Sequence, residues 1–468
     1  MSRVHVSGLN VNGLITNSIR KLPGADSISR VLEAALRAAD PAQAVMRHVQ
    51  RRVDKLVVGD RVYDLACIGR IFVIGFGKAV LPMAEAVLGV LDDCEVSGVL
   101  IAKEHSGRQV AGSFPAAIRV VFGTHPIPSE MNVESTQQLL GVLKGLEKND
   151  LVICLVSGGG SALFTLPAPG VDLVDLMTLT ERLLVCGADI REVNTLRKHI
   201  DLVKGGGLAR LTQPAKLVTL ILSDVVGNPL DVIASGPTAA DTSSYQDALN
   251  VLKQYDLLGK TPKSILAVLK RGAAGELPET LKNGDPALER CYNLVIGSNL
   301  QATEAALANA QTEGFNTLLL TSSLQGEASQ AGMVLGSILR QMAQTGQPMK
   351  RPACVVAGGE TTVTLRGSGR GGRNQELALG AVPNLDGMER VVLVTLATDG
   401  EDGPTDAAGA IISGETLTRA SLMGLNYREA LRNNDSYSYF DALGDLIRTG
   451  ATGTNVNDLT FLFTLKDV

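Results

Sequence analysis

Hydrophobic positions follow two different periods along the chain. Over residues 27–52 they recur at helical spacing, and Pro41 predicts a break between two helices. Further along, short β-branched runs alternate with helix-like stretches, which is typical of a parallel sheet covered by helices on both faces. In the first half we predict strands at residues 71–74, 98–101, 119–122, 151–156 and 217–222.

The second half repeats this pattern after an interruption. Residues 241–290 have the pattern of charged helices, and the Gly/Pro-rich stretch 272–286 is interpreted as a surface excursion. Strands are then predicted at 293–297, 317–321, 353–357, 361–366, 391–397 and 459–465. Because the run at 361–366 follows that at 353–357 as in a hairpin, we expect a mixed sheet here.

These patterns predict two α/β domains. Residues 1–245 would form a Rossmann-like domain with a doubly wound, largely parallel sheet, and residues 246–468 a smaller α/β domain with a mixed sheet. The helical segment 27–69 is free to pack on the second domain instead.

Composition excludes several classes of protein. The 468 residues are 45% hydrophobic and 19% charged, unlike a disordered chain or a disulfide-stapled one. A net charge of −5 and 3% aromatic residues argue against a nucleic-acid partner. Scattered cysteines and the lack of a long apolar run favour a cytoplasmic protein without a membrane partner. We expect a monomer or a homodimer; no sequence feature distinguishes the two. The acid-poor first 25 residues leave a targeting segment as an alternative.

Glycine is enriched, with 50 residues or about 11% against the usual ~7%. Glycine and polar residues gather where predicted strands end, which is where α/β sheets bind ligands. Glycine there allows close backbone approach, and successive N–H groups bind anions. The clusters are GFGKA (75–79), SGGGSA (157–162), SDVVGNP (223–229), GGET (358–361), GSGRGGR (367–373) and TDGEDGPTD (398–406).

Three candidates follow strands of the first half. Lys78, after Gly77, stands where a helix begins and a cation is unfavourable without an anionic ligand. The loop from Ser157 through Gly158, Gly159 and Gly160 to Ser161 is predicted to hold a phosphate or a carboxylate, an ordinary turn being the alternative. Asp224 is a candidate base or Mg²⁺ ligand, or else a helix cap.

Further candidates lie in other clusters. Arg373 is a candidate for contacting a transferring phosphoryl group, against the alternative of a mobile loop. The predicted nucleotide-binding residues of the second half are Gly358, Gly359, Glu360, Gly371, Gly372 and Asn374. The predicted substrate-binding residues are Gly77, Arg197, Lys198, Lys204 and Asn228, although the basic ones also suit an ordinary helix face. Asp399 and Asp402 could hold a cation or cap a helix.

Other chemistries lack their signatures. The five histidines show no H-x-x-H spacing for zinc, and no G-x-S-x-G elbow supports a serine hydrolase. Anion-binding loops, a strand-end lysine, a loop arginine and strand-end aspartates together indicate phosphoryl transfer, which depends on positioning and charge neutralisation.

The same motifs resemble those of a known family. GFGKA, VSGGGSAL, NTLRKHID, LSDVVGNP, IASGPT, GRGGRNQE, ATDGEDGPTDAAG and TGTNVNDL, in this order, are similar to the class II glycerate kinases. The resemblance implies an active site in a cleft between two domains. It also implies transfer of the γ-phosphoryl group of ATP to the 2-hydroxyl of D-glycerate with Mg²⁺, giving 2-phosphoglycerate and ADP. The family's motif lysine, aspartate and arginine fall on Lys78, Asp224 and Arg373.

Two alternatives stay open. A nicotinamide-dependent reductase of hydroxypyruvate or tartronate semialdehyde would suit the Rossmann-like half, with Glu104 placed to bind a ribose. Val80 counts against it, because the dinucleotide fingerprint requires a glycine at that position. The second alternative is a non-catalytic anion or nucleotide sensor.

Overall fold

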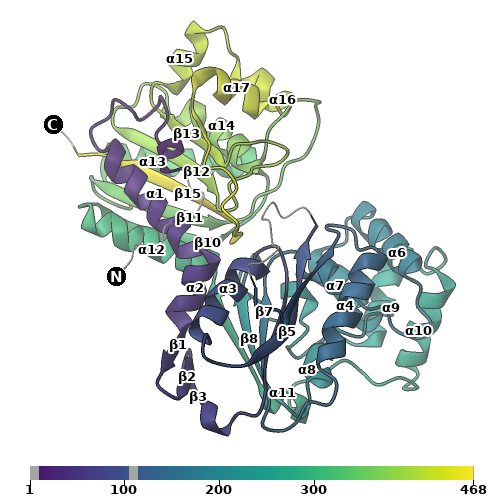
Figure 1. The fold of residues 1–468 in the computed structure, drawn as a ribbon. Helices are drawn as coiled ribbons and strands as arrows, with labels where there is room; N and C mark the ends of the chain where they lie inside the picture. Colours follow the sequence, from purple (N-terminus) through teal and green to yellow (C-terminus); the bar gives the residue numbers. More distant parts are fainter. Residues whose placement is uncertain (1–9, 105–113, 467–468) are drawn as a thin grey trace. The chain divides into compact units, whose positions relative to one another are not determined.

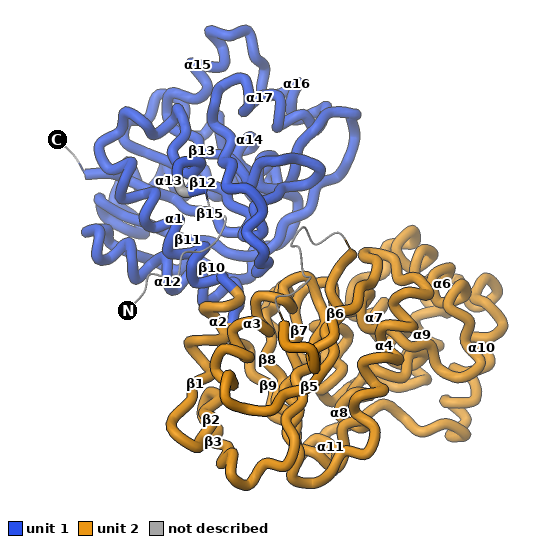
Figure 2. Tube along the Cα trace, in the orientation of Figure 1, with its two compact units in different colours: residues 1–40, 297–468 blue, residues 41–296 orange. Residues whose placement is uncertain are grey.

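The chain folds into two compact units, each built around its own sheet (Figures 1 and 2). The computed structural model describes residues 10–104 and 114–466. Unit 1 comprises residues 1–40 and 297–468, and unit 2 comprises residues 41–296. The prediction of two α/β domains, one with a mixed sheet, is confirmed. No helix in the described residues is long and apolar enough to cross a membrane.

The sheet of unit 2 has six strands in the order β6-β5-β4-β7-β8-β9. Along the chain this is the order 3-2-1-4-5-6 of Rossmann folds, which reverses between β4 and β7. The pairs β4–β5, β4–β7, β5–β6 and β7–β8 are parallel, as predicted. The strands are β4 (Ile71–Phe76), β5 (Val96–Lys103), β6 (Ile118–Gly123), β7 (Leu151–Val156), β8 (Lys216–Leu222) and β9 (Cys291–Gly297).

Burial on both faces explains why β4 and β7 are continuous apolar runs. Every residue of both strands is buried. Helix α3 (Val80–Val90) covers one face and α4 (Glu130–Val142) the other (Figure 1). On the α4 side the rings of Phe76 and Phe164 stack with centroids 4.2 Å apart. Burying such a ring contributes roughly 2–3 kcal/mol, and this pair fixes the ends of two loops that carry candidate residues.

Four helices form a second core in unit 2. They are α6 (Leu173–Val185), α7 (Ile190–His199), α9 (Tyr245–Gln254) and α10 (Lys263–Ala273), packed through buried leucines such as Leu179, Leu196 and Leu252. Because α9 and α10 pack on α6 and α7, and β9 joins the first sheet, the units divide at residues 296 and 297. The sequence had placed that division at 245 and 246.

The Gly/Pro-rich stretch 272–286 runs mostly along the surface, as expected, but Leu281 anchors it to the core of unit 2. Leu281 is 1% exposed, and its N–H donates to the carbonyl of Gly205 over 3.0 Å. A β-carbon at Gly206 would fall 2.5 Å from that of Leu281, so the two segments touch through glycine. The short helices α8 (Gly207–Leu211) and α11 (Pro286–Glu289) flank this contact.

A small antiparallel sheet in unit 2 was not predicted. After α2 (Pro41–His48), the strands β1 (Val49–Arg52), β2 (Lys55–Val58) and β3 (Arg61–Asp64) pair in sequence order. Residues 49–52 looked like the end of the second helix, because four residues are too few to separate the two periods.

The sheet of unit 1 is mixed and has the order β10-β11-β15-β12-β13-β14. Only β10 and β11 pair in parallel; the other pairs are antiparallel. The strands are β10 (Asn316–Leu324), β11 (Ala353–Gly359), β12 (Val391–Ala397), β13 (Gly409–Ser413), β14 (Leu446–Ile447) and β15 (Asp458–Thr464).

The predicted hairpin strand at 361–366 is wrong. Its only bridge joins Thr362 to Glu327. The two edges of β11 are taken by β10 and β15, with Cys354 opposite Phe463, so no edge is left for a hairpin partner. The sheet is mixed because β15, from the end of the chain, inserts between β11 and β12.

Helices surround this second sheet. They are α1 (Ala25–Ala39), α12 (Asn299–Thr312), α13 (Ala328–Thr345), α14 (Arg373–Leu385), α15 (Thr416–Leu422), α16 (Tyr427–Arg432) and α17 (Ser436–Leu443). Helix α1 lies beside α12 although the two are far apart in sequence (Figure 1), while residues 41–69 stay with unit 2. Helices α13 and α14 touch at backbone distance, since a β-carbon at Gly332 would fall 2.0 Å from the carbonyl oxygen of Leu377.

Candidate active site

The candidate site of unit 2 lies where the strand order reverses. Lys78 follows the end of β4, Ser157 follows β7, and Asp224 follows β8. Parallel strands bring their carboxyl ends to one edge of the sheet, and α/β proteins bind ligands at the reversal point on that edge. Three of the predicted glycine-rich clusters therefore meet at one place.

Backbone contacts join the first two loops. The N–H of Lys78 donates to the carbonyl of Gly158 over 2.9 Å, and the N–H of Ala79 donates to Ser157 Oγ over 3.0 Å. Gly77 has a φ of 131°, and a β-carbon there would fall 2.2 Å from Ser157 Oγ. Glycine at this position is what lets the loops after β4 and β7 touch.

Asp224 lies against the second loop. A β-carbon at Gly158 would fall 2.3 Å from Asp224 Oδ2, so the carboxylate occupies the space that any side chain would need. Burial raises the pKa of Asp224, while its own backbone N–H and the charge of Lys78 act in the opposite direction. A carboxylate with a raised pKa beside an ammonium group is suited to accept a proton.

Lys78 supplies an unengaged positive charge. Its side chain is exposed, and its ammonium group has no hydrogen-bond or ion-pair partner among the described residues. Its Cγ lies 3.4 Å from where a β-carbon at Gly159 would be. The lysine therefore stands beside both Asp224 and the glycine loop, available to an anionic ligand.

The same place holds His125, which had not been predicted as a site residue. Its Nε2 lies 3.3 Å from the position that a β-carbon at Gly159 would take. Burial, with the charges of Lys78 and Lys103, lowers the pKa of His125 to about 4. The imidazole is thus neutral at physiological pH. Its signal was present in the sequence, since His125 follows the predicted strand at 119–122 as Lys78 follows that at 71–74.

The loop after β7 also offers backbone donors. Within the described part of the chain, the N–H groups of Gly158, Gly159 and Ser161 have no hydrogen-bond partner. Gly159 has a φ of 82°, a conformation that turns successive N–H groups toward one point. These donors and the Lys78 ammonium favour an anion at this place.

A strained segment supports that loop from behind. The Oγ atoms of Ser161 and Ser235 lie 3.0 Å apart, and Ser235 Oγ donates to Asn194 Oδ1 over 2.9 Å. Ala234 and Ser235 have φ values of 50° and 62°, which cost about 1–3 kcal/mol each. Non-glycine residues keep such backbone angles where the surroundings enforce them, so this contact fixes the position of Ser161.

Two predicted substrate-binding lysines have structural roles instead. Lys204 Nζ donates to the carbonyls of Ser161 and Phe164 over 2.9 and 2.7 Å. Lys198 Nζ lies 3.1 Å from Asp241 and 3.3 Å from Asp231. Both side chains are buried. Sequence spacing cannot show that a basic side chain is already hydrogen-bonded to carbonyls or paired with carboxylates inside the protein.

Arg197 differs from its two basic neighbours. It is half-buried, and its guanidinium has no hydrogen bond or ion pair with any described residue. Burial lowers its pKa, and the carboxylate of Asp201 opposes that shift. Of the predicted basic cluster, Arg197 alone keeps its donors for a ligand.

Asn228, also predicted to bind substrate, adopts a φ of 53° in the turn after Asp224, where its N–H donates to the carbonyl of Val225.

Arg373 in unit 1 is held by two carboxylates. Its Nε and one terminal nitrogen donate to the two oxygens of Asp458 over 2.5 and 3.1 Å. Its other terminal nitrogen lies 3.3 Å from Glu360. This fixes the plane of the guanidinium at the start of α14 and leaves further N–H groups for a ligand.

The glycines of unit 1 make close protein contacts. A β-carbon at Gly358 would fall 1.8 Å from Asn299 Oδ1, one at Gly371 would fall 2.2 Å from Ser436 Oγ, and one at Gly359 would meet the backbone of Leu324. The loop at 367–373 is therefore packed against its surroundings, which speaks against the mobile-loop alternative.

Asp402 caps α14 rather than binding a metal. Its Oδ1 accepts the N–H of Asn374 over 3.1 Å, and its Oδ2 accepts that of Gln375 over 2.9 Å. A β-carbon at Gly372 would fall 2.3 Å from Asp402 Cγ, and burial raises the pKa of Asp402 to about 6. Asp399 accepts the N–H of Glu401 in the same turn. The described residues contain no group of three or more His, Cys, Asp or Glu that could hold a metal ion.

Comparison with known proteins agrees with this geometry. Residues 27–270 match the family described as a domain of unknown function, DUF4147, and residues 353–458 match the MOFRL family. A Pyrococcus horikoshii protein named glycerate 2-kinase is 41% identical, covering 92% of this chain and 95% of its own. A solved structure of glycerate kinase from Thermotoga maritima has a TM-score of 0.82 and 38% identity, covering 93% of this chain and 98% of its own.

Two relatives from Agrobacterium vitis have a different name. An Agrobacterium vitis protein, 38% identical and covering 92% of each chain, has the provisional name hydroxypyruvate reductase. Both domains, the kinase relatives and the shared fold nevertheless lead to one assignment. The chain belongs to the glycerate kinase family.

Proposed function

We propose that this protein transfers the γ-phosphoryl group of ATP to the 2-hydroxyl of D-glycerate, giving 2-phosphoglycerate and ADP. The observation that carries the proposal is the meeting of the Asp224 carboxylate, the free Lys78 ammonium and the unpaired loop amides at the reversal point of the sheet. Phosphoryl transfer needs a base at the acceptor hydroxyl and positive charge at the transferred group.

Asp224 is assigned the role of base. It would accept or orient the proton of the glycerate hydroxyl, since its raised pKa strengthens the ionised carboxylate as a proton acceptor. The contact with Gly158 holds it in place without using either oxygen in a hydrogen bond to another side chain.

We assign to Lys78 and the loop amides the role of binding the negatively charged groups of the substrates. The ammonium group and the N–H groups of Gly158, Gly159 and Ser161 would hold anionic oxygens, either of the phosphates or of the glycerate carboxylate. Arg197, with its unpaired guanidinium, is the second candidate for the carboxylate. The neutral imidazole of His125 can donate or accept one hydrogen bond beside them without adding charge.

We assign to Arg373 the role of stabilising the transferred phosphoryl group. Asp458 and Glu360 fix its guanidinium before substrate arrives, so its remaining donors need no reorganisation. Gly358, Gly359, Glu360, Gly371 and Gly372 remain candidates for the nucleotide through their backbone groups. The side chain of Asn374 is less suitable, since it is buried and lies 3.4 Å from Asp402.

The residues present do not fit a protein-held Mg²⁺. Both oxygens of Asp402 are used by backbone amides, and the described residues contain no group of three or more His, Cys, Asp or Glu that could hold a metal ion. A metal ion of the reaction would accompany the nucleotide phosphates, which commonly bind Mg²⁺ with few protein ligands. We assign no step to it.

The reductase alternative conflicts with the first loop. Val80 fills the place of the third fingerprint glycine, and its Cγ2 lies 2.7 Å from where a β-carbon at Gly75 would be. The discriminating experiment measures ADP release with ATP, Mg²⁺ and D-glycerate, and NADH consumption with hydroxypyruvate. Glycerate-dependent ADP release without NADH consumption is expected; the reverse pattern would contradict the proposal. The cytoplasm as location, and a monomeric or homodimeric state, remain predictions.

A further inference from the structure

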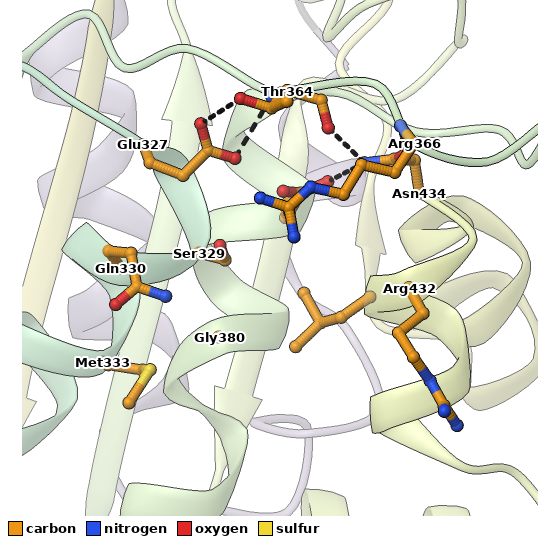
Figure 3. A pocket seen from close by; sticks show the side chains of 11 residues that line it. Glu327, Ser329, Gln330, Met333, Thr364, Arg366, Gly380, Arg432 and Asn434 are labelled. Atoms are coloured by element: carbon orange, nitrogen blue, oxygen red, sulfur yellow. Dashed lines mark hydrogen bonds between the residues drawn. The ribbon is translucent and has the colours of Figure 1, made fainter.

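Unit 1 has a pocket that the proposed reaction does not use. It has a volume of about 450 Å³ and lies among the first turns of α13 and α14, the end of α16 and the segment at 364–366 (Figure 3). Ligand pockets commonly measure about 300–1,000 Å³. The lining residues that matter here are Glu327, Met333, Arg366, Glu376 and Leu431.

A buried carboxyl group opens into this pocket. Glu376 is 5% exposed, and its Oε2 accepts the side-chain amide of Asn434 over 3.0 Å. Oε1 has no hydrogen-bond partner among the described residues, and Glu376 is one of the residues that line the pocket. Burial raises the pKa of Glu376 and the charge of Glu327 adds to the rise, while the hydrogen bond from Asn434 and the charge of Arg366 act in the opposite direction. A buried carboxyl group in this state favours a cationic partner.

The second carboxylate belongs to Glu327. Its two oxygens accept the N–H and the hydroxyl of Thr364 over 3.1 and 2.9 Å, which holds the carboxylate beside Thr364 in the pocket lining (Figure 3). Together Glu327 and Glu376 make one part of the pocket attractive to an ammonium group and repulsive to a simple anion.

An arginine supplies the opposite charge. Figure 3 shows the side chain of Arg366 reaching across the pocket in the direction of Ser329. Its backbone N–H donates to Asn434 Oδ1 over 2.7 Å, whereas its guanidinium has no hydrogen bond or ion pair with any described residue. A carboxylate is the ligand group that a free guanidinium binds best, through two parallel hydrogen bonds.

We propose that this pocket binds a small zwitterion of the α-amino acid class. The ammonium group pairs with Glu376 and Glu327, the carboxylate pairs with Arg366, and the side chain contacts Met333 and Leu431. A simple cation would leave the Arg366 guanidinium without a hydrogen-bonded partner, and a simple anion would meet two carboxylates, so a ligand with both charges suits this lining best.

The proposed binding site includes a residue of the helix that carries Arg373. Glu376 lies three residues after Arg373 in α14, less than one helical turn away. The proposal goes beyond the kinase activity and does not depend on it, because binding requires neither ATP nor glycerate.

Binding is tested on the full-length protein by ligand-observed NMR and thermal unfolding with glycine, L-alanine and L-leucine. Propionate and ethylamine serve as controls, since each lacks one charged group of L-alanine. Binding of the amino acids, with at least tenfold weaker binding of both controls, is expected. Equal binding of propionate or of ethylamine, or no binding of any amino acid, would overturn the proposal.

Variants locate the site. Arg366→Met removes an exposed guanidinium and Glu376→Gln keeps the contact with Asn434, so both should fold, which their unfolding temperatures check. Each should weaken L-alanine binding at least tenfold, while Arg340→Met, an exposed arginine of α13 outside the pocket, should leave it unchanged. Unchanged L-alanine binding in Arg366→Met would contradict the proposal, because the carboxylate would then not be bound by Arg366. Displacement of L-alanine by ADP that depends on Glu376 would also contradict it, because the pocket would then be a nucleotide site.

Discussion

The carboxylate of Asp224 packs against Gly158, and a β-carbon at this glycine would fall 2.3 Å from Asp224 Oδ2. The glycine of one loop therefore sets the position of the candidate base in another. This relationship connects the glycine content of the loop after β7 directly to the proposed chemistry.

Gly158→Ala should damage catalysis more than folding. The added methyl group displaces Asp224 from its position, and a misplaced base costs on the order of 100-fold in kcat. Gly141→Ala is the matched control, since a β-carbon at Gly141 in α4 has no atom within 4 Å. Steady-state kinetics and circular-dichroism melting check both variants. An unchanged kcat in Gly158→Ala would separate this glycine from the base.

Asp224→Asn should lower kcat by about 10²–10⁴-fold, the usual cost of losing a general base. The change preserves shape, so the substrate KM should shift much less. Asp256→Asn is the control, because Asp256 is fully exposed and asparagine also tolerates its φ of 52°. A kcat within tenfold of wild type would refute the assignment of Asp224.

Lys204→Met should act on stability. Removing the ammonium leaves the carbonyls of Ser161 and Phe164 and the carboxylate of Asp201 without their buried partner, which costs about 3–5 kcal/mol in the free energy of unfolding. Lys78→Met, at an exposed lysine, should lower kcat with little change in unfolding. Urea unfolding and kinetics of both variants check this contrast. A loss of stability in Lys78→Met and a loss of kcat alone in Lys204→Met would contradict both assignments.

His125→Gln should change how stability depends on pH. The folded-state pKa of about 4 lies below the ordinary value of 6.5, so the neutral ring favours the folded protein fully above pH 6.5. That contribution is lost as the pH falls from 6.5 toward 4. At pH 5 the wild type should lose on the order of 1–2 kcal/mol more than the variant, relative to pH 7.5, allowing for partial exposure. Parallel urea titrations at the two pH values measure the difference, and identical losses would mean that His125 keeps its ordinary pKa.

The sequence was most informative where burial is uniform. Strands β4 and β7 are apolar throughout, and β8 is apolar except for Lys216 and Thr219, because helices cover both faces of the sheet. The polar residues that follow these strands mark the site. The positions of Lys78 and Asp224 therefore followed from the strand pattern alone. His125 also follows a predicted strand, but β6 lies at the edge of the sheet, away from the reversal point, so only the fold shows that its loop reaches Gly159.

Contacts distant in sequence explain what the sequence missed or left open. Only the fold shows that Lys198 meets Asp241, or that both oxygens of Asp402 cap α14. The strand expected at 361–366 failed because β15 occupies the edge it required. Some glycines assigned to ligand loops, such as Gly358 and Gly371, also permit close approach of protein atoms. Glycine enrichment alone does not distinguish these two uses.

The most direct test of the account couples the reaction to enolase alone. Purified protein is incubated with ATP, Mg²⁺ and D-glycerate, and phosphoenolpyruvate is measured without any added phosphoglycerate mutase. Enolase accepts 2-phosphoglycerate directly, so the account predicts a glycerate-dependent signal at once. ADP release with no signal until a mutase is added would place the phosphoryl group on another hydroxyl, and an absence of ADP release would contradict the proposed kinase activity itself.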